Sequence, residues 1–419
     1  MNPKTLEIIR QFAEEGAFVW TQRAHAVQAP HFLLTDLARF DSRVESYVDG
    51  LRVYGDPAWE LCKLALEEEE VGGIFTAAVL AFESGNPDRI GAVVKAGSAT
   101  ARRARGLISA LGWLSYERAG PHIHKLLAAE STVLRRIGLA GATAHRRQVG
   151  RMVLESLAAP DPSLNARALR AMGELGQVQH AGELRKYLAA KDLACQFWAA
   201  WSATMLTKDP AARKALLTIG RKPGRFTRRA VQVLMGVLEF QMAGMFHLEL
   251  TLDPKLARDA IFAAGILGDV GTIPWLIKQM QVPPVARLAG EAFTNITGAN
   301  LSVEKLEGQQ PEGFEAGPTE NPEDENVAMD PDGNLSWPNP EAIQKWWNAH
   351  QGSFAKGQRY MLGKPITPEW LQEILRKGYQ RQRANAALEL AIRQPGRGLF
   401  EVRAPGFRQQ KILADVAHQ

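Results

Sequence analysis

The chain has 419 residues, of which 46% are hydrophobic and 23% are charged, and its formal net charge is +5. This composition excludes a disordered polymer, because the apolar residues suffice to bury a core over most of the length. The two cysteines, Cys62 and Cys195, are far apart in the sequence and provide neither a disulfide framework nor a CxxC ligand pair. We expect both to be buried, reduced thiols.

Residues 1–70 are predicted to form an N-terminal helical cap with breaks at Pro30 and at the stretch 54–57. The first residues lack the uninterrupted apolar stretch of a signal peptide, so we expect a cytoplasmic protein. The most apolar window, 231–250, contains Gln232, Glu239 and Glu249, which are costly in hydrocarbon. It therefore predicts a buried helix pair, and no membrane partner is expected.

Residues 71–306 are predicted to form an array of helical hairpins. The clearest evidence is an internal repeat, since Asp161-Pro162 through Leu175-Gly176 recurs at Asp253-Pro254 through Leu267-Gly268 with the same spacing. Each copy predicts one helix, a glycine stop and a second helix. The helix ends recur about every thirty residues, close to the compact variety of HEAT repeat. One hairpin cannot bury its own apolar face, whereas stacked hairpins bury a continuous core.

Residues 307–333 are predicted to be a loop, because they contain nine acidic residues, no basic ones and four prolines. Residues 334–419 then form a second helical segment, with a helix containing Trp346-Trp347 and another over 368–377, and we expect this segment to fold back onto the array. The predicted fold is all-α: a HEAT-like right-handed solenoid of α-α hairpins with an N-terminal helical cap and a C-terminal helical segment.

Basic residues provide the strongest functional signal. The stretch from Lys95 to Arg151 contains eleven Lys or Arg and only two acidic residues. The stretch from Lys208 to Arg229 contains eight basic residues and one acidic residue, Asp209. Stacked repeats would align such residues along one side of the solenoid, where they could hold an acidic protein, the chain's own acidic loop or nucleic acid. The alternative is that they cap helix carboxyl ends and lie scattered over several faces. The partner-binding candidates are Arg102, Arg103, Arg105, Arg135, Arg136, Arg146, Arg147, Arg221, Lys222, Arg225, Arg228 and Arg229.

The sequence offers no catalytic or metal-binding motif. The close pair His122 and His124 would point about 200° apart on a helix and could face one metal only in a loop after Pro121. No HExxH motif occurs. Neither a GxSxG elbow nor a GxxxxGK phosphate loop is present, and the run 67–70 of four acids is typical of a solvated turn. We therefore predict no catalytic residues, no metal and no cofactor. Phe197, Trp198 and Trp201, like Trp346-Trp347, are expected to pack between repeats, although aromatic residues beside a basic concave face also occur in HEAT-fold DNA glycosylases.

Segments at both ends of the chain together resemble a proteobacterial family of HEAT-repeat proteins that has no established activity. The segments are 23–38, Arg43-Val44-Glu45, Asp49-Gly50-Leu51-Arg52, Trp59-Glu60-Leu61-Cys62, Gly290-Glu291-Ala292-Phe293, Ile296-Thr297-Gly298, the acidic loop, Trp337-Pro338-Asn339-Pro340 and Trp346-Trp347. The resemblance implies an association with type VI secretion genes, often near spike proteins and toxic effectors. It supplies no catalytic residues.

The sequence thus favours a non-enzymatic protein-binding scaffold with a large concave surface, an adaptor or chaperone for a type VI secretion effector or spike component. The alternative from another class is a HEAT-fold nucleic-acid-binding protein that resembles a DNA glycosylase. A lyase-like protein that handles a chromophore is a third possibility, by analogy of fold alone.

Overall fold

The computed structural model describes residues 2–68, 70–317 and 329–417. It begins with three helices, α1 (Pro3–Ala26), α2 (Leu34–Tyr54) and α3 (Asp56–Leu64). Helices α1 and α2 pack along each other, and α1 also packs against the first helix of the array. The chain breaks between them at Pro30 and at Gly55, as predicted.

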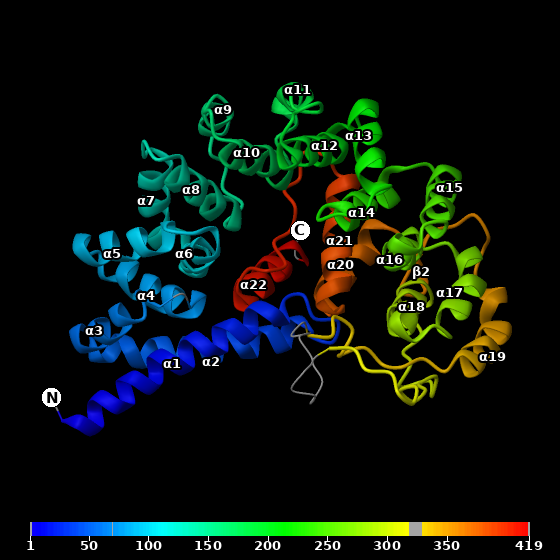
Figure 1. Ribbon diagram of the computed structural model, residues 1–419, viewed down its shortest axis with the longest axis horizontal. Coiled ribbons are helices and arrows are strands. Elements are labelled where there is room, and N and C mark those ends of the chain that lie inside the picture. The colour runs from blue at the N-terminus through cyan, green and yellow to red at the C-terminus, as the bar shows by residue number, and fades with distance from the viewer. Residues whose placement is uncertain (1, 69, 318–328, 418–419) are drawn as a thin grey trace.

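The array consists of two layers of helices that follow an arc (Figure 1). The helices of the inner layer each pack against the next inner helix: α4 (Val71–Ser84), α6 (Ala101–Trp113), α8 (Thr132–Ala144), α10 (Pro162–Glu174), α12 (Leu193–Thr207), α14 (Thr227–Val237), α16 (Ala257–Leu267) and α18 (Pro283–Thr297). The helices of the outer layer alternate with them along the chain: α5 (Pro87–Ser98), α7 (Tyr116–Leu127), α9 (Met152–Leu157), α11 (Ala181–Arg185), α13 (Pro210–Gly220), α15 (Phe240–Thr251) and α17 (Ile273–Gln279). The predicted all-α repeat solenoid is confirmed.

The internal repeat has the same local structure in both copies. The Asp161 carboxylate accepts a hydrogen bond from the Ser163 N–H, and the Asp253 carboxylate accepts one from the Lys255 N–H, so each aspartate caps the start of its helix. Gly176 and Gly268 follow the two helices with φ of 69° and 70°, a left-handed conformation that only glycine adopts without strain. Short 3-10 turns complete the units: η1 (Val178–His180), η2 (Pro254–Leu256) and η3 (Val270–Thr272).

The C-terminal segment contains α19 (Pro340–His350), the turn η4 (Gln351–Ser353), a hairpin of β1 (Tyr360–Met361) and β2 (Lys364–Pro365), and helices α20 (Pro368–Lys377), α21 (Gln380–Arg393) and α22 (Gly406–Ala417). The antiparallel hairpin was not predicted, because its strands have two residues each and show no alternating pattern. It caps the end of the array: the Tyr360 N–H donates to the Gly268 carbonyl at 2.9 Å and the Leu362 N–H to the Asn295 carbonyl at 2.7 Å.

Helices α20, α21 and α22 lie inside the arc of the array (Figure 1). Helix α21 packs against α12 and α14, and α22 packs against α2. The segment is part of the core, since Leu388 and Ile392 of α21 belong to the same apolar cluster as the inner helices. The concave surface that the sequence suggested for a partner is therefore largely covered by the chain itself.

The expected packing of the aromatic residues is confirmed. Phe197, Trp198 and Trp201 are buried in α12, and the Phe197 ring stacks on that of Phe226 with centroids 4.3 Å apart. Trp347 is buried in a second cluster formed by α16 to α19. Cys62 and Cys195 are free and buried, and burial raises the pKa of each thiol to about 12.

Candidate functional site

The connection between α21 and α22 is fixed to the inner helices by arginines. Arg408 of α22 donates to the carbonyl oxygens of Gly112, Trp113 and Leu114, at 2.9, 3.0 and 2.8 Å. These are carbonyl groups at the carboxyl end of α6, which have no partners within that helix. A guanidinium at this end also complements the helix dipole. Arg408 thus anchors α22 on the array.

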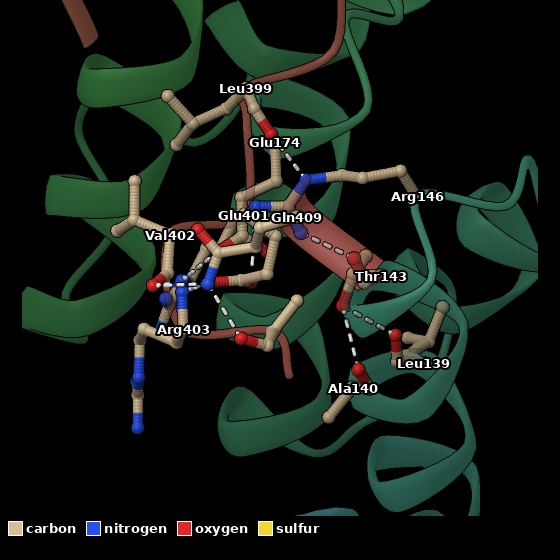
Figure 2. A network of polar contacts seen from close by, with 12 residues as sticks. Leu139, Ala140, Thr143, Arg146, Glu174, Leu399, Glu401, Val402, Arg403 and Gln409 are labelled. Carbon is tan, nitrogen blue, oxygen red and sulfur yellow. Dashed lines mark hydrogen bonds and ion pairs between the residues drawn. The ribbon is translucent and has the colours of Figure 1, made fainter. Parts of the chain in front are cut away.

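Arg146 fixes the same connection from the end of α8. Its Nη2 lies 3.1 Å from the Glu401 carboxylate, and its Nε donates to the Leu399 carbonyl oxygen. The Leu399 N–H in turn donates to the Glu174 carbonyl of α10 at 2.9 Å. Figure 2 shows this network, in which the side chain of Arg403 points away from Arg146 and Glu401.

A recess of about 160 Å³ lies between these anchored residues and the inner helices. We call it the arginine recess. From the array it is lined by α10, α12 and α14 and by Arg146, two residues after the end of α8, and from the C-terminal segment by α21 and the chain 399–403. Its lining residues are Arg146, Arg170, Glu174, Trp198, Trp201, Arg229, Gln232, Ala384, Ala387, Leu388, Leu399, Phe400, Glu401, Val402 and Arg403.

Positive charge exceeds negative charge in this recess, because four arginines line it against two glutamates. Both carboxylates are already engaged. Glu174 accepts from Arg170 Nε at 2.8 Å and also from Arg167, and Glu401 pairs with Arg146. Burial alone would raise the pKa of Glu174, but the Arg167 and Arg170 guanidiniums hold it well below its ordinary value. Glu174 is therefore ionised and fully used within the protein.

Two guanidiniums in the recess remain without such partners. Within the described residues, neither Arg229 nor Arg403 has a hydrogen bond or an ion pair from its side chain. Both side chains keep access to solvent, but partial desolvation inside the arc lowers the pKa of each. Arg170 lowers it further in both cases, whereas Glu174 raises the pKa of Arg229 and Glu401 raises that of Arg403. Arg229 also lies over the Trp198 ring, at 5.4 Å from its centroid. The mutual repulsion of these positive charges favours a bound anion.

The twelve residues predicted to bind a partner lie at two edges of the array. Each inner helix is joined to the next through an outer helix, so the inner helices run in the same direction and their amino ends form one edge. Ten of the twelve lie at this edge, in the first two turns of α6 and α8, in the first turn of α14, or in the chain between α13 and α14: Arg102, Arg103, Arg105, Arg135, Arg136, Arg221, Lys222, Arg225, Arg228 and Arg229. Arg146 and Arg147 follow α8 and lie at the opposite edge.

The ten residues form two groups, not one continuous surface. The groups are separated by the amino ends of α10 and α12, which begin with the capping residues Asp161 and Asp192. The hydrogen bond from Thr132 lowers the pKa of Asp161, and the neighbouring Arg136 adds to that effect. We call Arg102, Arg105 and Arg136 the α6/α8 patch, and Lys222, Arg225 and Arg228 the α14 patch.

Several predicted residues also have roles inside the protein. Arg103 donates to the carbonyl oxygens of Leu66 and Glu68 at 2.7 and 2.6 Å, and so holds the chain after α3. Arg221 pairs with Glu249 at 2.8 Å. Arg147 lies over the Tyr116 ring at 4.5 Å. Arg135 approaches the Ser156 hydroxyl at 3.5 Å.

The acidic loop contacts other arginines than those predicted. Arg258 pairs with Asp332 at 2.8 Å and Arg287 with Asp330 at 2.5 Å, and Arg381 of α21 donates to the Pro331 carbonyl oxygen at 3.2 Å. The end of the loop thus lies at α16, α18 and α21. Much of its acidic middle, 318–328, falls outside the described residues, so coverage of the predicted basic residues by this part is not described.

In the described parts of the chain, no group of three or more His, Cys, Asp or Glu side chains is placed to hold a metal ion. His122 and His124 both lie on α7. Within the same described ranges, a helix with the length and apolar character to cross a membrane is not found.

The two-layered arc of hairpins defines an α-solenoid of the helical-repeat class. In agreement, residues 151–235 match a family of HEAT repeats, over a span that runs from the start of α9 into α14. The protein therefore contains HEAT repeats, and the matched span includes Arg170, Glu174, Trp198, Trp201 and Arg229 of the recess. Comparison with curated proteins found no match.

Proposed function

We propose that the protein is a non-enzymatic scaffold that binds an acidic segment of a partner protein at the amino ends of its inner helices. One observation carries this proposal. The first turns of α6, α8 and α14 contain arginines and no acidic residue. Positive charge at the amino end of a helix opposes the helix dipole, at a cost of about 0.3–1 kcal/mol for each charge. Helix stability therefore does not explain these arginines. Contacts inside the protein account for Arg103 and Arg135, and an acidic ligand would account for the exposed Arg102 and Arg228.

The exposed side chains of this edge are available for such a ligand. Within the described residues, Arg102, Arg105 and Arg225 form no ion pair. Their long side chains are exposed and reach into solvent beside free N–H groups of the helix ends, which also attract carboxylates. An acidic segment lying along the edge would contact both kinds of donor.

The resemblance of the chain to a family associated with type VI secretion genes suggests the partner. We propose an effector or spike component that the protein holds as an adaptor or chaperone before delivery. Charge complementarity would give such a scaffold a fast, salt-dependent association with its partner.

The arrangement gives less support to binding of duplex DNA in the manner of a HEAT-fold glycosylase. Such a protein would hold DNA along a basic concave face. Here α20, α21 and α22 lie inside the arc, and Trp198 and Trp201, the aromatic residues considered for a flipped base, are buried in α12.

The experiment is a direct binding measurement between the purified protein and purified products of neighbouring secretion genes, by calorimetry at low and moderate salt. The test variant combines Arg102→Gln, Arg136→Gln and Arg225→Gln. The control variant combines Lys214→Gln, Lys255→Gln and Lys278→Gln, which remove the same charge from exposed sites elsewhere in the array. We expect the test variant to weaken binding at least about tenfold and the control to leave it unchanged. Equal binding by both variants would contradict the proposal.

A further inference from the structure

The arginine recess has the properties of a site for a small anion. Its two carboxylates are engaged with Arg146, Arg167 and Arg170, and the guanidiniums of Arg229 and Arg403 have no side-chain partner in the described structure. Besides partial desolvation, the positive charges of Arg170 and Arg403 both lower the pKa of Arg229, so an anion between these guanidiniums would relieve their mutual repulsion.

The volume of the recess limits the size of that anion. About 160 Å³ is many times what a single water molecule needs, so a small oxyanion with part of its hydration shell fits. A folded partner does not fit, because the chain 399–403 covers the recess from one side and is held there by Arg146 and by the Glu174 carbonyl.

The placement of the donors favours a phosphate group over a carboxylate. Arg170 comes from α10, Arg229 from α14 and Arg403 from the C-terminal chain, so their guanidiniums approach from three different elements. A phosphate dianion presents oxygens in a tetrahedral arrangement and can accept from all three, whereas a carboxylate presents two oxygens in one plane. The charge excess also suits a dianion better than a monoanion.

We propose that the arginine recess binds the phosphate group of a small molecule, with Arg170, Arg229 and Arg403 as its ligands. Such a ligand bridges the array and the C-terminal segment, because Arg229 belongs to one and Arg403 to the other. Bound phosphate therefore stabilises the docked position of the chain 399–403. This inference rests on other residues than the α6/α8 and α14 patches and does not depend on the identity of a protein partner.

The test is calorimetric titration of the full chain with inorganic phosphate, glycerol phosphate and acetate at equal ionic strength. Acetate controls for simple carboxylate binding. We expect saturable binding of at least one phosphate compound, at least about tenfold tighter than acetate. Tighter binding of the inorganic ion would identify free phosphate as the ligand, and tighter binding of glycerol phosphate would identify a phosphate ester.

Three variants locate the site. Arg229→Gln and Arg403→Gln should each weaken phosphate binding about tenfold or more, since each removes a charge-assisted donor. Both side chains are exposed and make no hydrogen bond in the described structure, so both variants should fold, which circular dichroism checks. Arg397→Gln is the control, because Arg397 is exposed and its side chain bonds only to Gln394. Absent binding, acetate binding as tight as phosphate, or equal binding by all three variants would overturn the proposal.

Loss of phosphate binding in these variants should leave binding of the protein partner unchanged. Conversely, the triple variant of the helix amino ends should retain phosphate binding. The two results together separate a failure of the phosphate site from a failure of the proposed scaffold function.

Discussion

Arg23 of α1 and Asp41 of α2 form a buried ion pair, with Nε and the carboxylate oxygen 2.7 Å apart and the carboxylate fully buried. The same guanidinium donates to the main-chain carbonyl oxygens of Arg403 and Ala404, each at 2.8 Å, and Asp41 accepts from the Gly406 N–H. One pair of side chains thus joins the N-terminal helices to the chain that covers the arginine recess, across almost the whole sequence.

This relationship predicts a large effect of Arg23→Met. The change leaves the Asp41 carboxylate buried without its counterion and removes two hydrogen bonds to the C-terminal chain. Removal of one partner of a buried pair costs about 3–5 kcal/mol. Urea unfolding measures this loss in the free energy of unfolding. The control is Arg39→Met, whose pair with Asp36 is exposed and should contribute less than about 1 kcal/mol. Similar unfolding midpoints for the two variants would contradict the account.

A second prediction concerns the docking of the β-hairpin at Gly268. Gly85 and Gly268 both follow inner helices with φ of 66° and 70°, so alanine at either position costs about 1 kcal/mol in backbone strain. Only at Gly268 would the added Cβ collide with another segment, the main chain of Tyr360, whereas the space beside Gly85 is open. Gly268→Ala should therefore lower the free energy of unfolding by about 1–3 kcal/mol more than Gly85→Ala. Thermal unfolding compares the two, and equal losses would show that the hairpin does not dock as described.

A third prediction concerns pH. His247 is buried against Trp275, and burial lowers its pKa to about 4, although a hydrogen bond with the Ala260 main chain partly opposes this shift. The unfolded chain binds a proton at this histidine near its ordinary pKa of 6.5, but the folded chain does not until about pH 4. Stability attributable to the neutral ring is therefore lost as the pH falls from 6.5 towards 4, by about 1.4 kcal/mol for each pH unit.

The measurement is urea unfolding at pH 7 and pH 5. The wild-type protein should lose about 2 kcal/mol more than His247→Gln over this interval, because the variant has no ring to protonate at this position. His25→Gln, at an exposed position of α1, is the control and should follow the wild type. An identical pH dependence of the wild type and His247→Gln would be inconsistent with a buried neutral histidine.

The fourth prediction concerns Arg408, which donates to three carbonyl oxygens at the end of α6. Arg408→Met should weaken docking of α22 by about 1–3 kcal/mol and so increase opening of the chain 394–405. Limited proteolysis followed by mass spectrometry detects this as faster cleavage within that chain. Arg397→Met, in the same connection but with a side chain that hydrogen-bonds only to Gln394 in the described structure, should be cleaved at the wild-type rate. Unchanged cleavage of Arg408→Met would indicate that other contacts hold α22.

The fold could be predicted from the sequence because its signals are local. Asp161 and Asp253 start their helices as caps, and Gly176 and Gly268 end them in a left-handed conformation, so the repeat reports hairpins directly. Local signals of this kind do not determine the position of the C-terminal segment. It depends on contacts such as Arg23 with the Arg403 carbonyl, which no periodicity reports.

The arginine recess could be predicted only in part, for the same reason. Arg146 and Arg229 were candidates because they lie in dense basic runs. Arg170 and Arg403 lie outside those runs and join the recess only through the stacking of α10 on α12 and the path of the chain 399–403. A search for arginines at inner-helix positions of every repeat would have found Arg170. Arg403 has no signal in the sequence.

The central claim is that the amino ends of the inner helices bind a type VI secretion effector or spike component. Affinity capture of the tagged protein from its own cells, at low and moderate salt and with mass spectrometry of the recovered proteins, tests it most directly. The wild type should recover such a protein, less of it at moderate salt, and the variant with Arg102→Gln, Arg136→Gln and Arg225→Gln should not. Equal recovery by the two proteins, or recovery of nuclease-sensitive material alone, would contradict the claim.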